Sequence, residues 1–328
     1  DDITNNTTPI IAGNAAADST VILSSDVDGV VGTTTADGSG NWSVTTDPLA
    51  EGLHSLTATS TDTAGNTSAA STALAATIDT TDPAAPGTAD LVAGSDSGTA
   101  DDDNITNNTT PVVAGTAEAG STIELTSSLD GVVATTTADG LGDWYVATTA
   151  LAQGDHDLTS TATDAAGNTG VSSAVLTITV DTAAPVAPSA PDLAGFSDSG
   201  TADDDDITSE TTPTLTGTAD PSTTVTLSSS LNGVVGTVTA DGLGLWSITT
   251  TTLSEGDHDL TATSTDTAGN TGDDSTALTI TVDTTDPAAP STPDLFALHD
   301  SGSSDTDNIT SNTTPIIAGN AAADSTVI

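Results

Sequence analysis

The sequence predicts an all-β chain of tandem immunoglobulin-like β-sandwich domains in an extended rod. The chain repeats itself at a spacing of 102 residues, so that Trp42, Trp144 and Trp246 fall in register, and a domain-sized period indicates a modular array. Short runs of Val, Ile, Leu and Thr alternate with polar residues between clusters of Gly, Asn, Asp and Pro, as in half-buried strands joined by turns. A repeat of about 100 residues is the usual size of an immunoglobulin-like sandwich.

The strands of one repeat emerge when its copies are compared at this spacing. Inward positions stay apolar, as in Leu23, Leu125 and Leu227, whereas the preceding position reads Ile22, Glu124 and Thr226. Turn signals in the first repeat are AGNAAADS, SSDVDG, ADGSGN, DPLAEG and DTAGN, in that order. We therefore expect six or seven short strands per repeat, in two antiparallel sheets, and no helices.

The period also divides the chain. We expect the first repeat over residues 1–83, the second over 84–185 and the third over 186–287, followed by a linker and the first strands of a further repeat over 288–328. The last 22 residues copy the first 22 more closely than they copy the second or third repeat. The array thus has a coarser period of three repeats and is typical of a window within a longer one.

The composition excludes several functions. Forty-seven Asp and Glu residues stand against no Lys or Arg, so the chain offers no basic surface for nucleic acid or for anionic lipid. No apolar run is long enough to insert in a membrane. Cysteine is absent, which excludes disulfides and thiolate metal sites. Because internal cations are lacking, the carboxylates must be balanced by salt or by bound metal ions.

Tryptophan and histidine recur once per repeat and favour structural roles. Trp42, Trp144 and Trp246 begin inward-facing runs, so we expect core residues rather than a carbohydrate platform. His54, His156 and His258 share the strand parity of buried leucines and have no second His or Cys nearby. This pattern favours a packed or capping histidine over a zinc ligand. It also provides no nucleophile with an orienting base, and we predict that the chain is not an enzyme.

Acidic residues gather where one repeat joins the next. The first junction runs from Asp79 to Thr106 and is rich in Pro, then in Asp. The candidate ligands in the three junctions are Asp79, Asp90, Asp96, Asp101 and Asp103, then Asp181, Asp192, Asp198, Asp203 and Asp205, then Asp283, Asp294, Asp300, Asp305 and Asp307. Asp82 and Asp102 recur less regularly and are weaker candidates.

Alternating strand direction predicts which loops meet these junctions. The loop before the last strand reads D-x-A-G-N and supplies Asp62, Asn66, Asp164, Asn168, Asp266 and Asn270. We expect it at the preceding junction, together with the loop after the second strand, which contains Asp28, Asp130 and Asn232. The turn at Asp37 is expected at the opposite end of the repeat.

Oxygen ligands without nitrogen or sulfur favour Ca²⁺, which takes six to eight oxygens, over Mg²⁺, which keeps its waters. The alternative is that these Asp and Asn residues make Asx-turns and keep an extracellular surface soluble. For the cluster as a whole we favour calcium, because mutually repelling carboxylates need a cation that the chain does not supply.

The motifs TxDNITNxTTPxIxGxA, ADGxGxWxVxT, LxxGxHxLTATxTDxAGN and LTITVDTxAPxAP occur in this order in the repeats. They resemble the bacterial immunoglobulin-like repeats of giant secreted surface adhesins, of the RTX and biofilm-associated type. The resemblance implies an extracellular extender at the bacterial cell surface, with calcium bound at domain junctions. It also implies that Asp79, Asp181 and Asp283, the linker Asp residues and the D-x-A-G-N Asp residues hold metal.

Two functions follow as expectations. The first is a structural extender of an adhesin, made rigid by calcium between neighbouring repeats, that projects or links cells in adhesion and biofilm. The second is a self-assembling extracellular filament or matrix fibre, in which other copies pair laterally or by strand addition.

Overall fold

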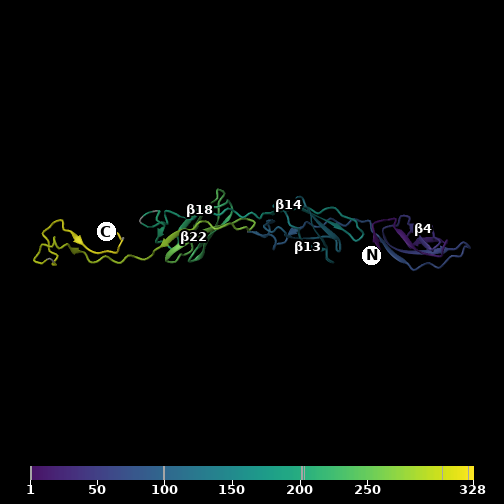
Figure 1. The fold of residues 1–328 in the computed structure, drawn as a ribbon, viewed down its shortest axis with the longest axis horizontal. Coiled ribbons are helices and arrows are strands. Elements are labelled where there is room, and N and C mark those ends of the chain that lie inside the picture. The colour runs from purple at the N-terminus through teal and green to yellow at the C-terminus, as the bar shows by residue number, and fades with distance from the viewer. Residues whose placement is uncertain (1, 99, 201, 203, 305, 324) are drawn as a thin grey trace. The chain divides into compact units, whose positions relative to one another are not determined.

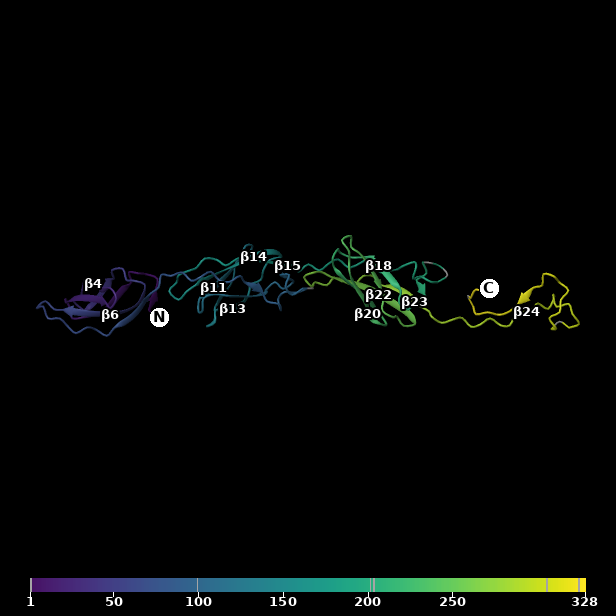
Figure 2. The same cartoon turned by 180° about the vertical axis from the view of Figure 1, so that it is seen from behind.

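The computed structural model describes residues 2–98, 100–200, 202, 204–304, 306–323 and 325–328. Within these residues every regular element is a β-strand, and the predicted all-β fold class is confirmed. No helix in the described part of the chain has the length and apolarity needed to cross a bilayer. Figures 1 and 2 trace the strands of successive repeats from purple to yellow.

The second repeat shows the complete architecture. Its strands are β8 (Asp90–Leu91), β9 (Ile105–Thr106), β10 (Val112–Thr116), β11 (Thr122–Ser127), β12 (Gly131–Thr137), β13 (Asp143–Ala147), β14 (Gly154–Thr163) and β15 (Leu176–Val180). One sheet has the order β12-β11-β14-β15-β9, and the other has the order β13-β10-β8. All pairs are antiparallel except β9 with β15, which is parallel.

The other repeats follow the same plan. The first contains β1 (Ile3–Thr4), β2 (Ile10–Asn14), β3 (Thr20–Ser25), β4 (Gly29–Thr35), β5 (Asn41–Thr45), β6 (Gly52–Thr61) and β7 (Leu74–Ile78). The third contains β16 (Asp192–Leu193), β17 (Ile207–Thr208), β18 (Thr214–Thr218), β19 (Thr224–Ser229), β20 (Gly233–Thr239), β21 (Leu245–Thr249), β22 (Gly256–Thr265) and β23 (Leu278–Val282). Beyond it, β24 (Asp294–Leu295) pairs with β25 (Ile317–Ala318).

The chain forms two compact units. The first comprises Asp1–Pro185 together with Thr265–Gly272, and the second comprises Val186–Ser264 together with Asp273–Ile328. The loop 265–272 of the third repeat therefore belongs to the same unit as the first two repeats.

Each sandwich has a small apolar core between its sheets. In the second repeat Ile123, Leu125, Leu158 and Val180 are wholly buried and surround Trp144, which is 2% exposed. The inward positions predicted from the period-two pattern are thus confirmed. Gly115 lies opposite Trp144 in the register of β10 and β13, and an added Cβ would stand 2.6 Å from the indole ring. Glycine leaves the space that lets the large ring pack flat against the backbone.

The histidines are structural, as predicted. His156 is wholly buried, its Nε2 lies 2.8 Å from the carbonyl oxygen of Ala152, and its Nδ1 lies 2.8 Å from Ser127 Oγ. A carbonyl only accepts, so Nε2–H donates to it, and in the neutral ring Nδ1 accepts from the serine hydroxyl. The same contacts recur at His54 and His258. Each histidine therefore ties the start of a long strand to the end of another.

Two turns of each repeat lie at the ends opposite to those predicted. In the second repeat Thr122 pairs with both Thr137 and Thr163. The turn at Asp139 and the loop at Asp164 therefore share one end, which we call the leading end. The turn at Asp130 lies at the other end, the trailing end, with Asp181. The expected positions of both turns, and of their equivalents Asp28, Asn232, Asp37 and Asp241, were wrong.

The physical reason is the linker strand β8. It pairs with β10 in antiparallel direction, so the linker crosses the whole repeat before the first predicted strand begins. Because of this extra strand, the first predicted strand starts at the trailing end instead of the leading end. The turns at Asp130 and Asp139 therefore lie at the ends opposite to those predicted.

Candidate metal-binding loops

An acidic loop closes the trailing end of the second repeat. It follows β8 and contains Asp96, Asp101 and Asp103 before β9 returns beside β15. Asn104, which precedes β9, has a left-handed backbone with φ of 60°. Asp2, Asp206 and Asn308 occupy the same position with the same conformation, which Asn and Asp tolerate better than other side chains. The chain therefore turns sharply at Asn104, and Asp103 before it lies beside Asp96.

Asp96 is a buried carboxylate with an unused oxygen. The side chain is 7% exposed, and Oδ2 accepts a 3.1 Å hydrogen bond from the backbone N–H of Asn104. Oδ1 is buried and has no hydrogen-bond partner among the described residues. Burial raises the pKa of Asp96, against the Asn104 hydrogen bond, and repulsion from Asp103 raises it further. A buried, unpaired carboxylate oxygen is a costly feature that a cation would relieve.

The third repeat repeats this arrangement. Asp198 is 8% exposed, its Oδ1 has no partner among the described residues, and its Oδ2 accepts from the N–H of Asp206 at 3.3 Å. The pKa of Asp206 is raised by burial and by the carboxylates of Asp198, Asp192, Asp205 and Asp204. In the C-terminal segment, Oδ1 of Asp300 is likewise unpaired within the described residues.

Asp206 belongs to this cluster although the sequence analysis did not select it. It stands where the other copies have Asn104 and Asn308, and within the junctions only positions that keep Asp were chosen as candidates. The left-handed turn before the short strand was the missing signal. The pattern Asp-Ile-Thr or Asn-Ile-Thr at the 102-residue spacing marks it in every copy.

The first Asp of each D-x-A-G-N loop accepts hydrogen bonds from the Asn at the end of the same loop. Asp62 accepts hydrogen bonds from the side chain and backbone of Asn66, which lower its pKa. At Asp164, burial is opposed and outweighed by hydrogen bonds from Asn168, so its pKa is also lowered. Both carboxylates are thus held in the ionised form by their own loop. This is the Asx-turn interpretation that the sequence left open.

The same loops also reach the end of the preceding repeat within the first compact unit. Asn168 Nδ2 donates a 2.8 Å hydrogen bond to the carbonyl oxygen of Asp79, and Asn270 Nδ2 donates one of 2.8 Å to that of Asp181. The expected approach of the D-x-A-G-N loop to the strand-end Asp is therefore present. The contact uses the backbone carbonyls, while the Asp79 and Asp181 carboxylates cap their own turns at Thr81 and Ala183.

The acidic loop meets the D-x-A-G-N loop of the following repeat. Ser97 Oγ donates to the carbonyl oxygen of Ala268 at 2.7 Å, and Gly98 lies against the carbonyl of Thr267. Ala268 is wholly buried. Besides the start of the linker at Asp181, the acidic loop that adjoins residues 267–268 is therefore 96–104, from the linker before the second repeat, and not the acidic run at Asp198 and Asp205 as the sequence predicted. The crossing of β8 moves each acidic loop to the far end of its own repeat.

The remaining predicted residues are more dispersed. Asp90, Asp192 and Asp294 lie exposed on the linker strands, and Asp283 caps its own turn at Thr285. Asp307 lies beside Asp300, and its pKa is lowered by hydrogen bonds led by that from Ile309 N–H. Asp101 is exposed. Asp203 and Asp305 lie outside the described residues. Across the described ranges no three His, Asp or Glu side chains stand close enough to hold an ion by themselves.

One prediction tests the loop contact at Asn168. Replacement of Asn168 by Ala removes the hydrogen bonds to Asp79 O and to Asp164 Oδ2, and we expect a loss of about 1–2 kcal/mol in stability. Hydrogen exchange of the amides around residues 79–83 measures it. Asn66→Ala is the matched control, because Asn66 is exposed and its Nδ2 donates to Asp62. Equal effects of the two substitutions would contradict a role for the Asp79 contact.

The chain is similar to several solved structures. A solved structure concerned with host cell surface retention of a 1.5-MDa bacterial ice-binding adhesin is 24% identical, with 86% of this chain and 92% of that chain covered and a TM-score of 0.32. A BSP domain of a biofilm-associated protein is 15% identical, with 84% and 64% covered and a TM-score of 0.23. The fibronectin(III)-like modules of Clostridium thermocellum CbhA are 17% identical, with 54% and 87% covered and a TM-score of 0.33.

No curated protein matches the chain. The model of the bacterial Ig-like domain matches three successive segments, residues 1–80, 83–182 and 185–284. These segments account for most of the sequence, and each contains one of the sandwiches described above. The chain therefore belongs to the bacterial Ig-like domain family and contains three tandem copies of that domain.

Proposed function

We propose that the chain is an extender segment of a bacterial cell-surface adhesin, in which calcium bound by the acidic loops stiffens the array. The role needs tandem domains that contact their neighbours, and the hydrogen bond from Asn168 to the Asp79 carbonyl recurs between Asn270 and Asp181. It requires no catalysis, and the buried histidines have both ring nitrogens engaged in hydrogen bonds. The similarity to domains from an ice-binding adhesin and a biofilm-associated protein is consistent with an extracellular location.

Asp96 and Asp198 each have a buried oxygen without a hydrogen-bond partner among the described residues, and this observation supports calcium. A carboxylate oxygen without a donor loses its hydration on folding and gains nothing in return. The neighbouring acids are Asp103 at the first loop and Asp205 with Asp206 at the second. Calcium accepts such carboxylates together with backbone carbonyls and waters, and its flexible coordination tolerates an irregular loop. Magnesium demands octahedral geometry and fits less well.

The position of the loop connects ion binding to stiffness. Loop 96–104 contacts residues 267–268, which belong to the following repeat, through Ser97 and Gly98. An ion that orders the loop would order this contact as well. The formal net charge of −47 adds a second effect, because bound divalent cations reduce the repulsion between repeats.

The decisive experiment is a calorimetric calcium titration of the full chain. We expect dissociation constants of about 0.1–1 mM, as in other extracellular modules. Asp96→Asn and Asp198→Asn should each remove one class of sites. Glu124→Gln is the matched control, since it removes one charge from an exposed strand position. A chain that binds no calcium at millimolar concentration, or variants that bind as the parent does, would refute the proposal.

The same variant should have opposite effects with and without calcium. Folding raises the pKa of Asp96 above its ordinary value of 3.8, so the folded state binds the proton more tightly than the unfolded state does. The resulting stabilisation is complete at acid pH and is lost as pH rises through the folded pKa. At neutral pH in chelator, Asp96→Asn should therefore stabilise the second repeat by about 1 kcal/mol. In calcium it should be the less stable protein, as measured by hydrogen exchange of β15.

Small-angle scattering with and without chelator tests the mechanical part of the proposal. We expect a longer maximum dimension and a narrower distribution in calcium than in chelator. Identical curves would leave calcium binding intact and exclude stiffening. This experiment also tests the predicted extended rod.

A further inference from the structure

A glycine follows the D-x-A-G-N loop in the second and third repeats, two residues after the Asn. The backbone carbonyl of Pro83 lies against Gly170, and a Cβ added to that glycine would overlap the carbonyl oxygen. Gly272 meets the carbonyl of Pro185 in the same way. Neither glycine has a left-handed φ, so the backbone conformation itself would admit other residues. Glycine is needed here because another stretch of backbone approaches so closely.

The same loop holds the start of the linker at a second point. Residues 79–83 leave the first repeat and read Asp-Thr-Thr-Asp-Pro. Asn168 Nδ2 donates a 2.8 Å hydrogen bond to the Asp79 carbonyl, while Gly170 packs against the Pro83 carbonyl. We call residues 79–83 the exit segment, and Asn168 with Gly170 the socket. The socket thus contacts both ends of the exit segment, and both of its residues are buried.

The third repeat has an equivalent socket. Asn270 Nδ2 donates to the Asp181 carbonyl at 2.8 Å, and Gly272 packs against the Pro185 carbonyl. The exit segment here is 181–185, Asp-Thr-Ala-Ala-Pro, which shares Asp, Thr and Pro with the first one. In both joints the socket contacts backbone carbonyls, which every segment of this pattern presents. The socket therefore fits the backbone of an Asp-Thr-x-x-Pro segment and tolerates changes at its two variable positions.

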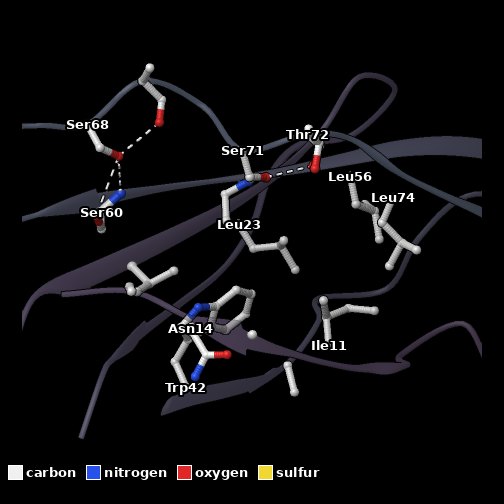
Figure 3. A pocket seen from close by; sticks show the side chains of 16 residues that line it. Ile11, Asn14, Leu23, Trp42, Leu56, Ser60, Ser68, Ser71, Thr72 and Leu74 are labelled. Carbon is white, nitrogen blue, oxygen red and sulfur yellow. Dashed lines mark hydrogen bonds between the residues drawn. The ribbon is translucent and has the colours of Figure 1, made fainter. Parts of the chain in front are cut away.

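The first repeat has Ser68 where the socket needs glycine. Ser68 N–H donates to the Ser60 carbonyl at 2.9 Å, as Gly170 N–H donates to the Ala162 carbonyl at 2.9 Å. The backbone bond is the same, so the Cβ of Ser68 takes the direction in which the Pro83 carbonyl lies beside Gly170. The Ser68 hydroxyl accepts a 3.0 Å hydrogen bond from the Ser60 N–H (Figure 3). The fold therefore accepts serine at this position, but the close contact with an exit segment does not.

We propose that the socket is a docking site for the exit segment of the preceding repeat, and that its glycine determines which repeats dock. A repeat with Gly170 or Gly272 closes the joint in front of it, and a repeat with serine at this position leaves that joint open. The partner is any Asp-Thr-x-x-Pro segment of the array, and residues 283–287 repeat the sequence of residues 79–83. The order of glycine and serine repeats would then set where the array bends.

This inference goes beyond the proposed role of calcium. The contacts use an amide group, a glycine and backbone carbonyls, and no acidic side chain of the loop 96–104 takes part. Contacts between domains of one chain are often small, and relative motion is expected where they are lost. Removal of the glycine contact should therefore loosen a joint whether or not calcium is present.

Residues imported from the first repeat test the role of the glycine. Residues 164–171 differ from residues 62–69 at three positions, 165, 170 and 171. Gly170→Ser gives the second repeat the serine of the first. The matched control is the double variant Ala165→Thr/Val171→Ala, which imports the other two residues and keeps the glycine. Ala165 and Val171 are exposed, so neither change should affect folding.

Distances between spin labels on the first two repeats of the full chain provide the measurement. The chain has no cysteine, so Val30→Cys and Val132→Cys add one label to each repeat, at side chains that are 61% and 55% exposed. We expect a narrow distance distribution in the labelled parent and in the control. In Gly170→Ser the distribution should be at least about twofold wider, because the linker alone then restrains the repeats.

Two further measurements separate an open joint from a misfolded repeat. Hydrogen exchange of β14 should be the same in Gly170→Ser as in the parent, since the first repeat folds with Ser68. Gly272→Ser repeats the test at the next joint, with labels at Val132→Cys and Val234→Cys. Val234 is 61% exposed. If Gly170→Ser loses the protection of β14, the result at Gly272 decides.

Equal widths in the parent and in the serine variants would overturn the proposal. A control as wide as Gly170→Ser would overturn it too, because the other loop residues would then determine the joint. The difference between parent and Gly170→Ser should persist in chelator, and its disappearance there would mean that calcium closes the joint instead of the socket. A chain that binds no calcium would refute the calcium proposal and leave this comparison unchanged.

Discussion

Replacement of Gly98 by Ala is expected to separate the acidic loop of the second repeat from residues 265–272. Gly98 has a φ of 125°, a conformation that side chains rarely adopt, and an added Cβ would overlap the carbonyl of Thr267. Neither strain nor overlap can be relieved by a side-chain rotation, because both involve backbone. The loop must therefore move, and the Ser97 hydrogen bond to Ala268 O is lost with it.

Hydrogen exchange of the peptide covering residues 265–272 measures this separation. We expect rapid exchange in Gly98→Ala and protection in the parent, where Ala268 is wholly buried. Gly94→Ala is the matched control, because no atom lies within 4 Å of a Cβ added there. If both variants keep the protection of the parent, the loop contact does not hold residues 265–272.

The second large effect is expected at His156. Its replacement by Ala opens a cavity and leaves the Ser127 hydroxyl and the Ala152 carbonyl without their partner. Loss of packing and of two buried hydrogen bonds should destabilise the second repeat by about 3 kcal/mol. Native-state hydrogen exchange of β14 reports this repeat separately from its neighbours.

The first repeat suggests a control for that measurement. It has Ser55 where the second has Asp157, an exposed neighbour of His156. Asp157→Ser should change stability by no more than about 0.5 kcal/mol. An unchanged exchange rate in His156→Ala would mean that the histidine does not stabilise the second repeat, and the structural role assigned to it would be wrong.

Local sequence patterns predicted which strand side chains are buried and which face solvent. The alternation predicted that Leu23, Leu125 and Leu227 lie in the core, and all three are buried. The outward positions between the apolar ones differ from copy to copy, which supports the same assignment. The parity of His156 with Leu158 predicted burial in the same way. Such predictions succeed because side-chain direction along a strand depends only on the backbone, with a period of two.

The sequence predicted which residue types make up the candidate site, but it predicted only in part which of them are buried and lie together. Asp96 and Asp198 were selected as acids, and the structure adds that each is buried, with one oxygen unpaired within the described part of the chain. Asp90 and Asp283 were selected on the same grounds and lie exposed. Burial of a loop side chain depends on how the loop closes, and the left-handed turn at Asn104 and Asp206 sets that closure. The number and spacing of acidic residues do not indicate such a turn.

By itself, the sequence determined the modular period, the strands and their inward faces, the family, and the excess of carboxylates that needs a counter-ion. Only the tertiary structure decided which loops share an end, and therefore which acids face which neighbour. The reason is that a two-residue strand such as β8 has too little pattern to be recognised along the chain. Its pairing with β10 nevertheless carries the linker across the repeat, so that the turns at Asp130 and Asp139 lie at the ends opposite to those predicted.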